Sequence, residues 1–322
     1  MDYGALIREA WTTTWRHRFL WILGLFAGGA AGLAWGGGRG PGVQWRTQNH
    51  DMERFGPAAG RVAEVVGSWM AANAGLVVAV AVAAALLGLL ALVVSLVAQG
   101  GMAEATVDLA SGRSSSLGRA WRTGLRLFWR YAGLWLLLIA LGIAIAAVIG
   151  ALVALLAGLA SFGGVAAPVA VLVGLLIGAP LVLMGIVFVV AMSIVVAYAQ
   201  RAIFAEDAGP VAALRSGWRL LRAHPGASAL AWLVNLALGI GAGIVTALAL
   251  LMVFAVLGGI GAAVWAVAGF SIPTIAYGAL GLLVVIVAGA ILTAIANTFF
   301  WNYWTLAYLR LTGRPDAMPT GV

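Results

Sequence analysis

The sequence contains very few charged residues. Only 9% of its 322 residues are Asp, Glu, Lys or Arg, whereas 64% are apolar. A soluble domain has about a quarter of its residues charged, because its surface must stay in contact with water. This shortage excludes an ordinary soluble protein and predicts a multi-pass membrane protein.

Cysteine is absent, so the chain has no disulfide, no thiolate metal site and no cysteine nucleophile. The three histidines, His17, His50 and His224, are fewer ligands than a metal site needs. The sequence also shows no catalytic constellation and no phosphate-binding glycine loop of the Walker type. We therefore predict no metal, no cofactor and no enzymatic activity.

Lysine is absent too, and all 18 basic side chains are arginines in a chain of net charge +8. In a membrane protein a basic balance is typical of cytoplasmic loops that face anionic lipid. We therefore expect anionic membrane lipids as partners and no nucleic acid.

Four long segments lack charged residues and locate the membrane, because one Arg at a helix centre costs ~2.5–3.5 kcal/mol. They are Phe19–Gly38, Val65–Gln99, Tyr131–Gln200 and Ala223–Leu309. Each of the last two is long enough for at least two spans of ~20 residues. Turn residues at 161–168, and at 258–261 and 269–273, mark the expected breaks. We predict an all-α bundle of about six transmembrane helices, at 19–36, 75–98, 132–158, 169–199, 228–256 and 277–307.

The arginines predict the orientation of the chain. Of the 18, 14 lie on one side of the predicted spans, and the other four lie in the external loop 37–74. The positive-inside rule then places both termini in the cytoplasm, with the protein in a bacterial cytoplasmic (inner) membrane. An alternative is a signal peptide with a weak cleavage site at Gly32–Ala34.

The single membrane domain, residues 1–322, contains a threefold pattern. Trp11, Trp121 and Trp218 each follow a small residue and an apolar residue at the same spacing, and each leads into a span. Gly112, Gly209 and Gly313 lie at equivalent places at the ends of the units. We predict three parallel repeats, at about 1–112, 113–209 and 210–313, each an amphipathic helix followed by two spans.

The helices that precede the second and the third pair of spans carry arginines on one face and apolar residues on the other. Such helices lie in the membrane interface, and we expect their tryptophans to be buried and their arginines to face headgroups. Arg122, Arg126, Arg215 and Arg219 are the predicted lipid-headgroup or anion ligands. They either anchor the chain in bulk anionic lipid or converge on one ligand such as a lipid phosphate.

Two further features concern cavities and surfaces. Among the few polar residues in the spans, Asn235 and Asn297 are the best candidates to line a cavity, with interhelical hydrogen bonding as the alternative. The loop 37–74 is expected to contain a helix after Pro57 that lies on the outer surface or extends the second span. A glycine ladder begins at Gly24 and indicates close helix packing within the chain or in a homo-oligomer.

One segment resembles a known group of proteins. Residues Gln200–Arg222 (QRAIFAEDAGPVAALRSGWRLLR), together with Trp11–Leu25, resemble bacterial membrane proteins related to the membrane domain of glycerophosphoryl diester phosphodiesterases. The hydrolase domain and its acidic metal-binding residues are missing here. The resemblance implies a six-helix membrane module and no catalytic role.

Two functional hypotheses remain open at this stage. The first is a non-enzymatic membrane protein that binds or moves a lipid or another amphipathic molecule. The second is a structural or accessory membrane subunit that interacts with a protein partner. A cavity that opens sideways to the membrane favours the first, whereas a sealed core with an external apolar groove favours the second.

Overall fold

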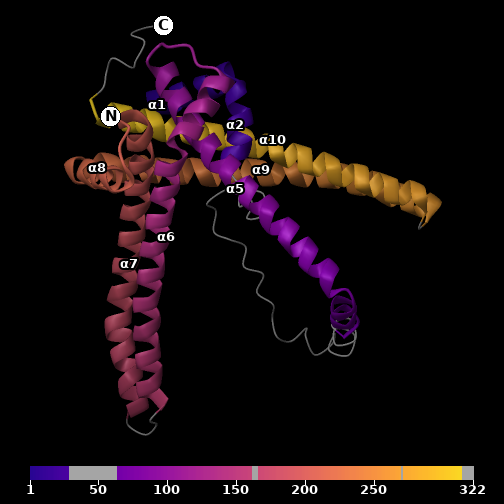
Figure 1. The fold of residues 1–322 in the computed structure, drawn as a ribbon, viewed down its shortest axis with the longest axis horizontal. Coiled ribbons are helices and arrows are strands. Elements are labelled where there is room, and N and C mark those ends of the chain that lie inside the picture. Colours follow the sequence, from indigo (N-terminus) through magenta and orange to yellow (C-terminus); the bar gives the residue numbers. More distant parts are fainter. Residues whose placement is uncertain (29–63, 162–165, 270, 314–322) are drawn as a thin grey trace. The chain divides into compact units, whose positions relative to one another are not determined.

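The computed structural model describes residues 1–28, 64–161, 166–269 and 271–313, and all regular structure in these ranges is helical (Figure 1). The helices are α1 (Tyr3–Arg16), α2 (Phe19–Ala27), α5 (Ala74–Ala110), α6 (Leu117–Ser161), α7 (Ala166–Glu206), α8 (Pro210–Ala223), α9 (Pro225–Ala268) and α10 (Ile272–Leu311). The predicted all-α fold class is confirmed.

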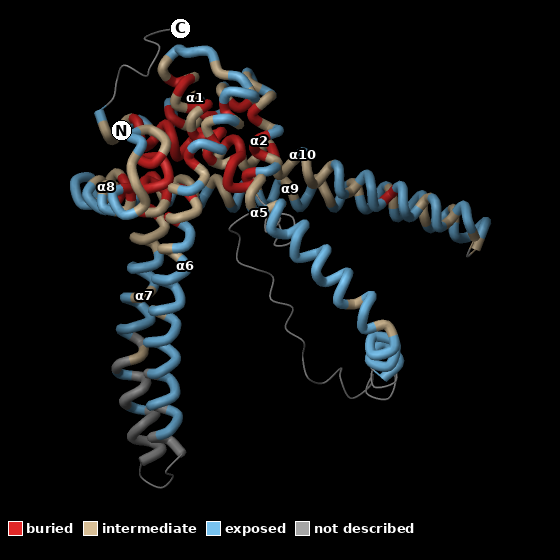
Figure 2. Tube along the Cα trace, viewed as in Figure 1, coloured by how far each residue is buried: buried red, intermediate tan, exposed pale blue. Residues whose placement is uncertain are grey.

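Five helical stretches are long and apolar enough to cross a membrane. They are Ala74–Ala110, Leu117–Leu155, Pro180–Glu206, Pro225–Ala268 and Ile272–Leu311. Most of their length is exposed, as Figure 2 shows in pale blue, and such apolar surface is what acyl chains would cover. The structure is consistent with a multi-pass membrane protein.

The predicted first span, 19–36, is described only in part. α2 covers nine residues of it, and residues 29–36 lie outside the described ranges. The count of six spans therefore stays a prediction. The external loop 37–74 is described only from residue 64, where residues 64–72 form the expected helix and lead through Asn73 into α5.

One of the two expected breaks in the last long segment is wrong. α9 continues through the glycines at 258–261 and ends at Ala268, where Gly269 adopts a φ of +54°. A glycine inside a helix costs only about 1 kcal/mol relative to Ala. An apolar segment in lipid must keep its backbone hydrogen-bonded, and this requirement outweighs that cost. The turn forms where Gly269 supplies the left-handed conformation and Thr274 Oγ1 donates to its carbonyl at 2.7 Å.

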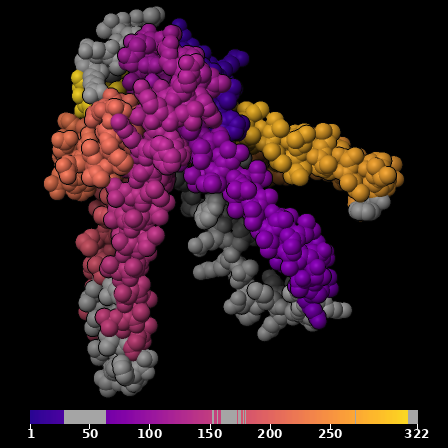
Figure 3. Space-filling view, viewed as in Figure 1, coloured from indigo at the N-terminus to yellow at the C-terminus, as the bar shows by residue number. Residues whose placement is uncertain are grey.

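The chain divides into two compact units. The first comprises residues 1–27, 96–238 and 294–322, and the second comprises residues 28–95 and 239–293. In the second unit the Tyr277 hydroxyl donates to the Leu257 carbonyl at 2.7 Å and joins α10 to α9. Residues 74–90 of α5 are almost all exposed, and Figure 3 shows their side chains open on the visible face.

The first unit holds the larger buried core, which includes four fully buried tyrosines. Each tyrosine hydroxyl donates a hydrogen bond to another helix. The pairs are Tyr131 with Gln99 Oε1 at 2.5 Å, Tyr198 with Ser228 at 3.1 Å, Tyr303 with the Ala231 carbonyl at 2.9 Å, and Tyr308 with Glu206 at 2.6 Å. The rings therefore fill the core while their polar ends stay satisfied.

The helices that precede the spans begin and end at recognisable signals. α1 starts after Asp2, whose carboxylate accepts from the Ala5 N–H at 3.0 Å, and α8 starts with Pro210 in its first turn. Both end at a histidine, since His17 and His224 are the C-caps. The second such helix is the start of α6 and continues without a break.

The expectation that the tryptophans of these helices are buried is wrong for Trp11 and Trp218, whereas Trp121 is half-buried and packs against a buried cluster. Trp11 is 52% exposed and Trp218 is 39% exposed. The buried position is the small residue just before each tryptophan, namely Ala10, Ala120 and Gly217. A small side chain permits close approach of two helix backbones, and the bulky tryptophan beside it is then directed outward.

Two of these helices approach the preceding span at equivalent positions. A Cβ added to Gly101 would lie 2.6 Å from the Ala120 carbonyl oxygen, and one added to Gly217 would lie 3.4 Å from Tyr198 Cβ. Gly101 and Tyr198 each lie 20 residues before the tryptophan of the helix that they contact. α1 packs on the end of α10, where the Trp11 and Phe299 rings are 6.0 Å apart.

These contacts agree with the predicted repeat, and the repeat arrangement as a whole stays a prediction. The three equivalent glycines do not behave alike. Gly112 and Gly313 have φ values of +71° and +65°, whereas Gly209 is extended and caps α8. In the second predicted repeat, residues 113–209, the residue with a left-handed backbone is Asp207, with φ +53°.

Candidate functional site: an arginine-lined pocket between α6 and α7

The four arginines predicted as headgroup ligands are exposed on two helices. Arg122 and Arg126 lie on α6, and Arg215 and Arg219 lie on α8. None of the four forms an ion pair with another residue that the structure describes. Their charges are therefore available to a ligand or to lipid.

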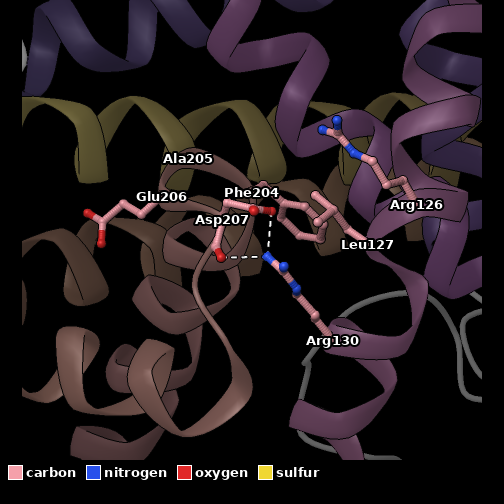
Figure 4. Close-up of a pocket in the computed structure, with 7 residues that line it drawn as sticks. All are labelled: Arg126, Leu127, Arg130, Phe204, Ala205, Glu206 and Asp207. Atoms are coloured by element: carbon pink, nitrogen blue, oxygen red, sulfur yellow. Dashed lines mark hydrogen bonds and ion pairs between the residues drawn. The ribbon is translucent and has the colours of Figure 1, made fainter.

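One of them, Arg126, lines a pocket between residues 126–130 of α6 and the end of α7 (Figure 4). The pocket has a volume of about 440 Å³. Its lining residues are Arg126, Leu127, Arg130, Phe204, Ala205, Glu206 and Asp207. Arg122, Arg215 and Arg219 do not line it.

Helical spacing and an aromatic contact build this pocket. Arg126 and Arg130 are four residues apart on α6, which places them on one face of the helix. Leu127 is buried and fixes the rotation of that helix. The Tyr131 and Phe204 rings are 5.3 Å apart and hold the end of α7 against α6.

Arg130 is paired inside the pocket with Asp207. Its Nη1 donates to the Asp207 main-chain oxygen at 2.5 Å and lies 2.5 Å from the Asp207 Oδ1. The hydrogen bond and the charge of Arg130 hold the pKa of the Asp207 carboxyl below its usual value. Both side chains remain well exposed, at 42% and 67%, so water and solutes can reach the pair.

Arg126 is not paired in this way. In Figure 4 the side chains of Leu127 and Phe204 lie between the guanidinium groups of Arg126 and Arg130. No hydrogen bond or ion pair joins Arg126 to the other lining residues. The carboxylates of Glu104 and Asp207 are near enough to interact with its charge. Glu206 points away from both arginines and accepts from the Tyr308 hydroxyl at 2.6 Å.

The pocket lies beside both ends of the charge-free segment that runs from α6 into α7. Arg130 is the last charged residue before Tyr131–Gln200, and Arg201 is the first after it. Since α6 and α7 form one hairpin, both ends of this stretch meet at the same level. In a hairpin that spans a membrane, such a level is where the helices leave the acyl chains and meet the headgroups.

The asparagines considered for a cavity do not line this pocket. Asn297 Nδ2 donates to the Gly24 carbonyl at 3.1 Å and joins α10 to α2. This is the interhelical hydrogen bond that was the alternative interpretation. Asn235 lies on α9, where its Oδ1 is buried without a hydrogen-bond partner among the described residues.

Sequence reasoning missed Arg130, Phe204 and Asp207 as parts of this site. Arg130 carried one usable signal, because it is the last charge before a long apolar segment. Asp207 carried none, since its place beside Arg130 depends on how α7 returns against α6. Among the described residues no group of histidine, aspartate and glutamate side chains is placed to hold a metal ion.

Comparison with known proteins gives a family but no activity. No curated protein matches the chain, and no solved structure matches it. The family that does match covers residues 12–314, which is nearly the whole chain, and its description gives no function. The resemblance to the membrane domain of glycerophosphoryl diester phosphodiesterases therefore stays a prediction. The chain belongs to DUF7544, a family of unknown function.

Proposed function

We propose that this protein is a non-enzymatic, multi-pass membrane protein that binds phospholipid through arginines at the ends of its helices. The observation that carries the proposal is the pocket with Arg126 and Arg130 at the border of the charge-free stretch. Guanidinium groups bind phosphate through paired N–H donors, and this geometry suits a lipid headgroup.

The surroundings of the pocket favour a lipid over a soluble ligand. Leu127 and Phe204 line it beside the arginines. Trp129, next to Arg130, is 80% exposed, and Leu136 is exposed further along α6. An amphipathic molecule could place its charged group on the arginines and its chains along this apolar surface. Tryptophan at this level is typical of a membrane interface.

The proposal includes an orientation. The arginines of α6 and α8 lie on the side that the positive-inside rule assigns to the cytoplasm, together with both termini. In a bacterial inner membrane that leaflet contains anionic lipid, and each arginine near it contributes about 1 kcal/mol to attraction. The four arginines would together hold lipid at this side of the membrane.

The test is to measure how many phospholipids each protein molecule keeps after a detergent wash. The variant replaces Arg122, Arg126, Arg215 and Arg219 with Gln. A control variant replaces the four arginines of the predicted external loop, Arg39, Arg46, Arg54 and Arg61, and so removes the same charge. We expect the first variant to lose most bound anionic lipid and the control to keep it. Equal retention in the two variants would show that the proposal is wrong.

A second candidate function is an accessory subunit that binds another membrane protein. One observation favours it: an exposed apolar face of α10, formed by Leu283, Val284, Val287, Ala288 and Ile291. A helix of a protein partner or of a second copy of the chain would fit such a surface. Crosslinking from a photoreactive residue at position 287 distinguishes the two, because a lipid gives lipid adducts and a partner gives a protein band.

A further inference from the structure

The pairing of Asp207 with Arg130 has the geometry of an internal substitute for a bound anion. Asp207 presents a carboxylate oxygen and a main-chain oxygen to one guanidinium nitrogen, each at 2.5 Å. A phosphate group would use the same donors, because arginine binds carboxylate and phosphate through the same planar set of N–H groups. The ligand and Asp207 would therefore compete for Arg130.

The backbone at Asp207 supports this role. Asp207 is the one non-glycine residue of the described ranges with a positive φ, at +53°. This left-handed conformation is costly for most residues, although Asp and Asn adopt it more readily than others. It places the carboxylate beside Arg130 in the short connection between α7 and α8. Such a conformation at a ligand-accessible pair is a reason to look for a function there.

We infer that the pocket binds the phosphate of a phosphomonoester lipid, and that Asp207 is an internal competitor that occupies Arg130 until the phosphate displaces it. This inference rests on the proposed function. Arg126 would make the first contact, because it is exposed and unpaired among the described residues. Arg130 would join once its bond to Asp207 opens.

The chemistry favours a phosphomonoester over a phosphodiester. A monoester carries about −1.5 to −2 charges at neutral pH and three free oxygens. A diester carries one charge and two free oxygens, so it has less to offer two guanidinium groups. Displacing the Asp207 carboxylate from Arg130 needs the larger charge, and the extra oxygen is available to Arg126 once its guanidinium turns past Leu127 and Phe204 toward the phosphate. We therefore expect phosphatidic acid to bind more tightly than phosphatidylglycerol.

The decisive variant is Asp207→Asn. Asn adopts the same left-handed conformation and has nearly the same size, so it removes the competing charge with little change in the fold. The matched control is Asp108→Asn, which removes the carboxylate of another Asp–Arg pair, with Arg113 at 2.7 Å, outside this pocket. A third variant, Arg126→Lys, keeps the charge but loses the paired donors.

The measurement is the affinity of the purified full-length protein for phosphatidic acid in nanodiscs of otherwise neutral lipid. We expect Asp207→Asn to bind at least threefold more tightly, Asp108→Asn to match the wild type, and Arg126→Lys to bind at least fivefold more weakly. Phosphatidylglycerol should bind more weakly than phosphatidic acid. Inorganic phosphate at the same concentration should compete poorly, because it lacks the acyl chains that contact α6.

The outcomes separate this inference from the proposed function. If the wild type binds no anionic lipid, the proposed function fails and this inference fails with it. If the wild type binds lipid but Asp207→Asn binds equally or more weakly, the competitor role is overturned and the proposed function stands. If inorganic phosphate competes as well as phosphatidic acid does, the ligand is a soluble phosphate and the assignment to a lipid is overturned.

Discussion

Asn302 and Thr14 lie 288 positions apart in the chain, yet the Asn302 Nδ2 donates to the Thr14 Oγ1 at 3.0 Å. The Oδ1 of the same amide accepts from the Thr106 hydroxyl at 2.8 Å. One buried side chain therefore joins α1, α5 and α10. Thr14 also donates to the Ala10 carbonyl of its own helix, and the single proton of Thr106 is shared between Asn302 Oδ1 and the Met102 carbonyl, at 2.8 Å from each.

The first prediction concerns this amide. Asn302→Ala removes two interhelical hydrogen bonds, which average about 0.6 kcal/mol each in membrane proteins, and it also leaves a small cavity. We expect the free energy of unfolding in detergent to fall by about 1–3 kcal/mol, with a lower melting temperature. Thermal unfolding followed by circular dichroism measures this.

Asn73→Ala is the control for that measurement. The Asn73 amide donates only to the Trp69 carbonyl of its own helical segment, so its loss should change stability very little. If both variants melt at the wild-type temperature, the amide of Asn302 does not hold the three helices together.

The second prediction concerns the close approach of α6 to α5. A Cβ on Gly124 would collide with the Val97 carbonyl oxygen, which belongs to the backbone and cannot swing away. We expect Gly124→Ala to lower the melting temperature because the helices must separate. Gly118→Ala on the same helix should raise stability slightly, since no atom lies within 4 Å of the added Cβ and Ala favours helix over Gly. The same sign for the two variants would contradict the packing.

Much of the fold could be predicted from the sequence because charge in a membrane is costly. The charge-free segments located the long apolar helices, and the low proportion of charged residues excluded a soluble fold. Exact helix ends could not be found in this way, as the glycines at 258–261 show. The helix continues there because its apolar neighbours must keep their backbone hydrogen bonds. The sequence alone does not show that this requirement outweighs the lower helix propensity of glycine.

The site was only partly predictable. Arg126 was expected as a headgroup ligand and does line the pocket. Asp207 was not among the predicted site residues, because nothing in the local sequence places it beside Arg130. Similarly, the outward direction of Trp218 follows from the close packing of its neighbour Gly217, and helical periodicity alone assigned the tryptophan to the buried face.

The third prediction concerns topology. Reporter fusions at Gly112 and at Gly209 should both report a cytoplasmic location, and one at Gly163 should report an external location. The reason is that α6 and α7 form a hairpin with arginines at its base and none along its length. Gly163 lies outside the described residues, so the fusion tests the sequence prediction directly. A cytoplasmic signal at Gly163 would rule out the predicted orientation of this hairpin.

The last prediction concerns pH and the pair of Arg130 with Asp207. The hydrogen bond and charge of Arg130 lower the pKa of the Asp207 carboxyl from its ordinary value of 3.8. A carboxyl whose pKa is lower in the folded state stabilises the fold above its unfolded pKa, and that contribution is lost as the pH falls through the folded pKa. We expect the difference in melting temperature between the wild type and Asp207→Asn to be constant from about pH 5 to pH 8 and to shrink below about pH 4. Other carboxylates titrate alike in the two proteins, so the difference isolates this pair. A difference that instead changes between pH 6 and pH 8 would show that Asp207 is not held in its charged form by Arg130.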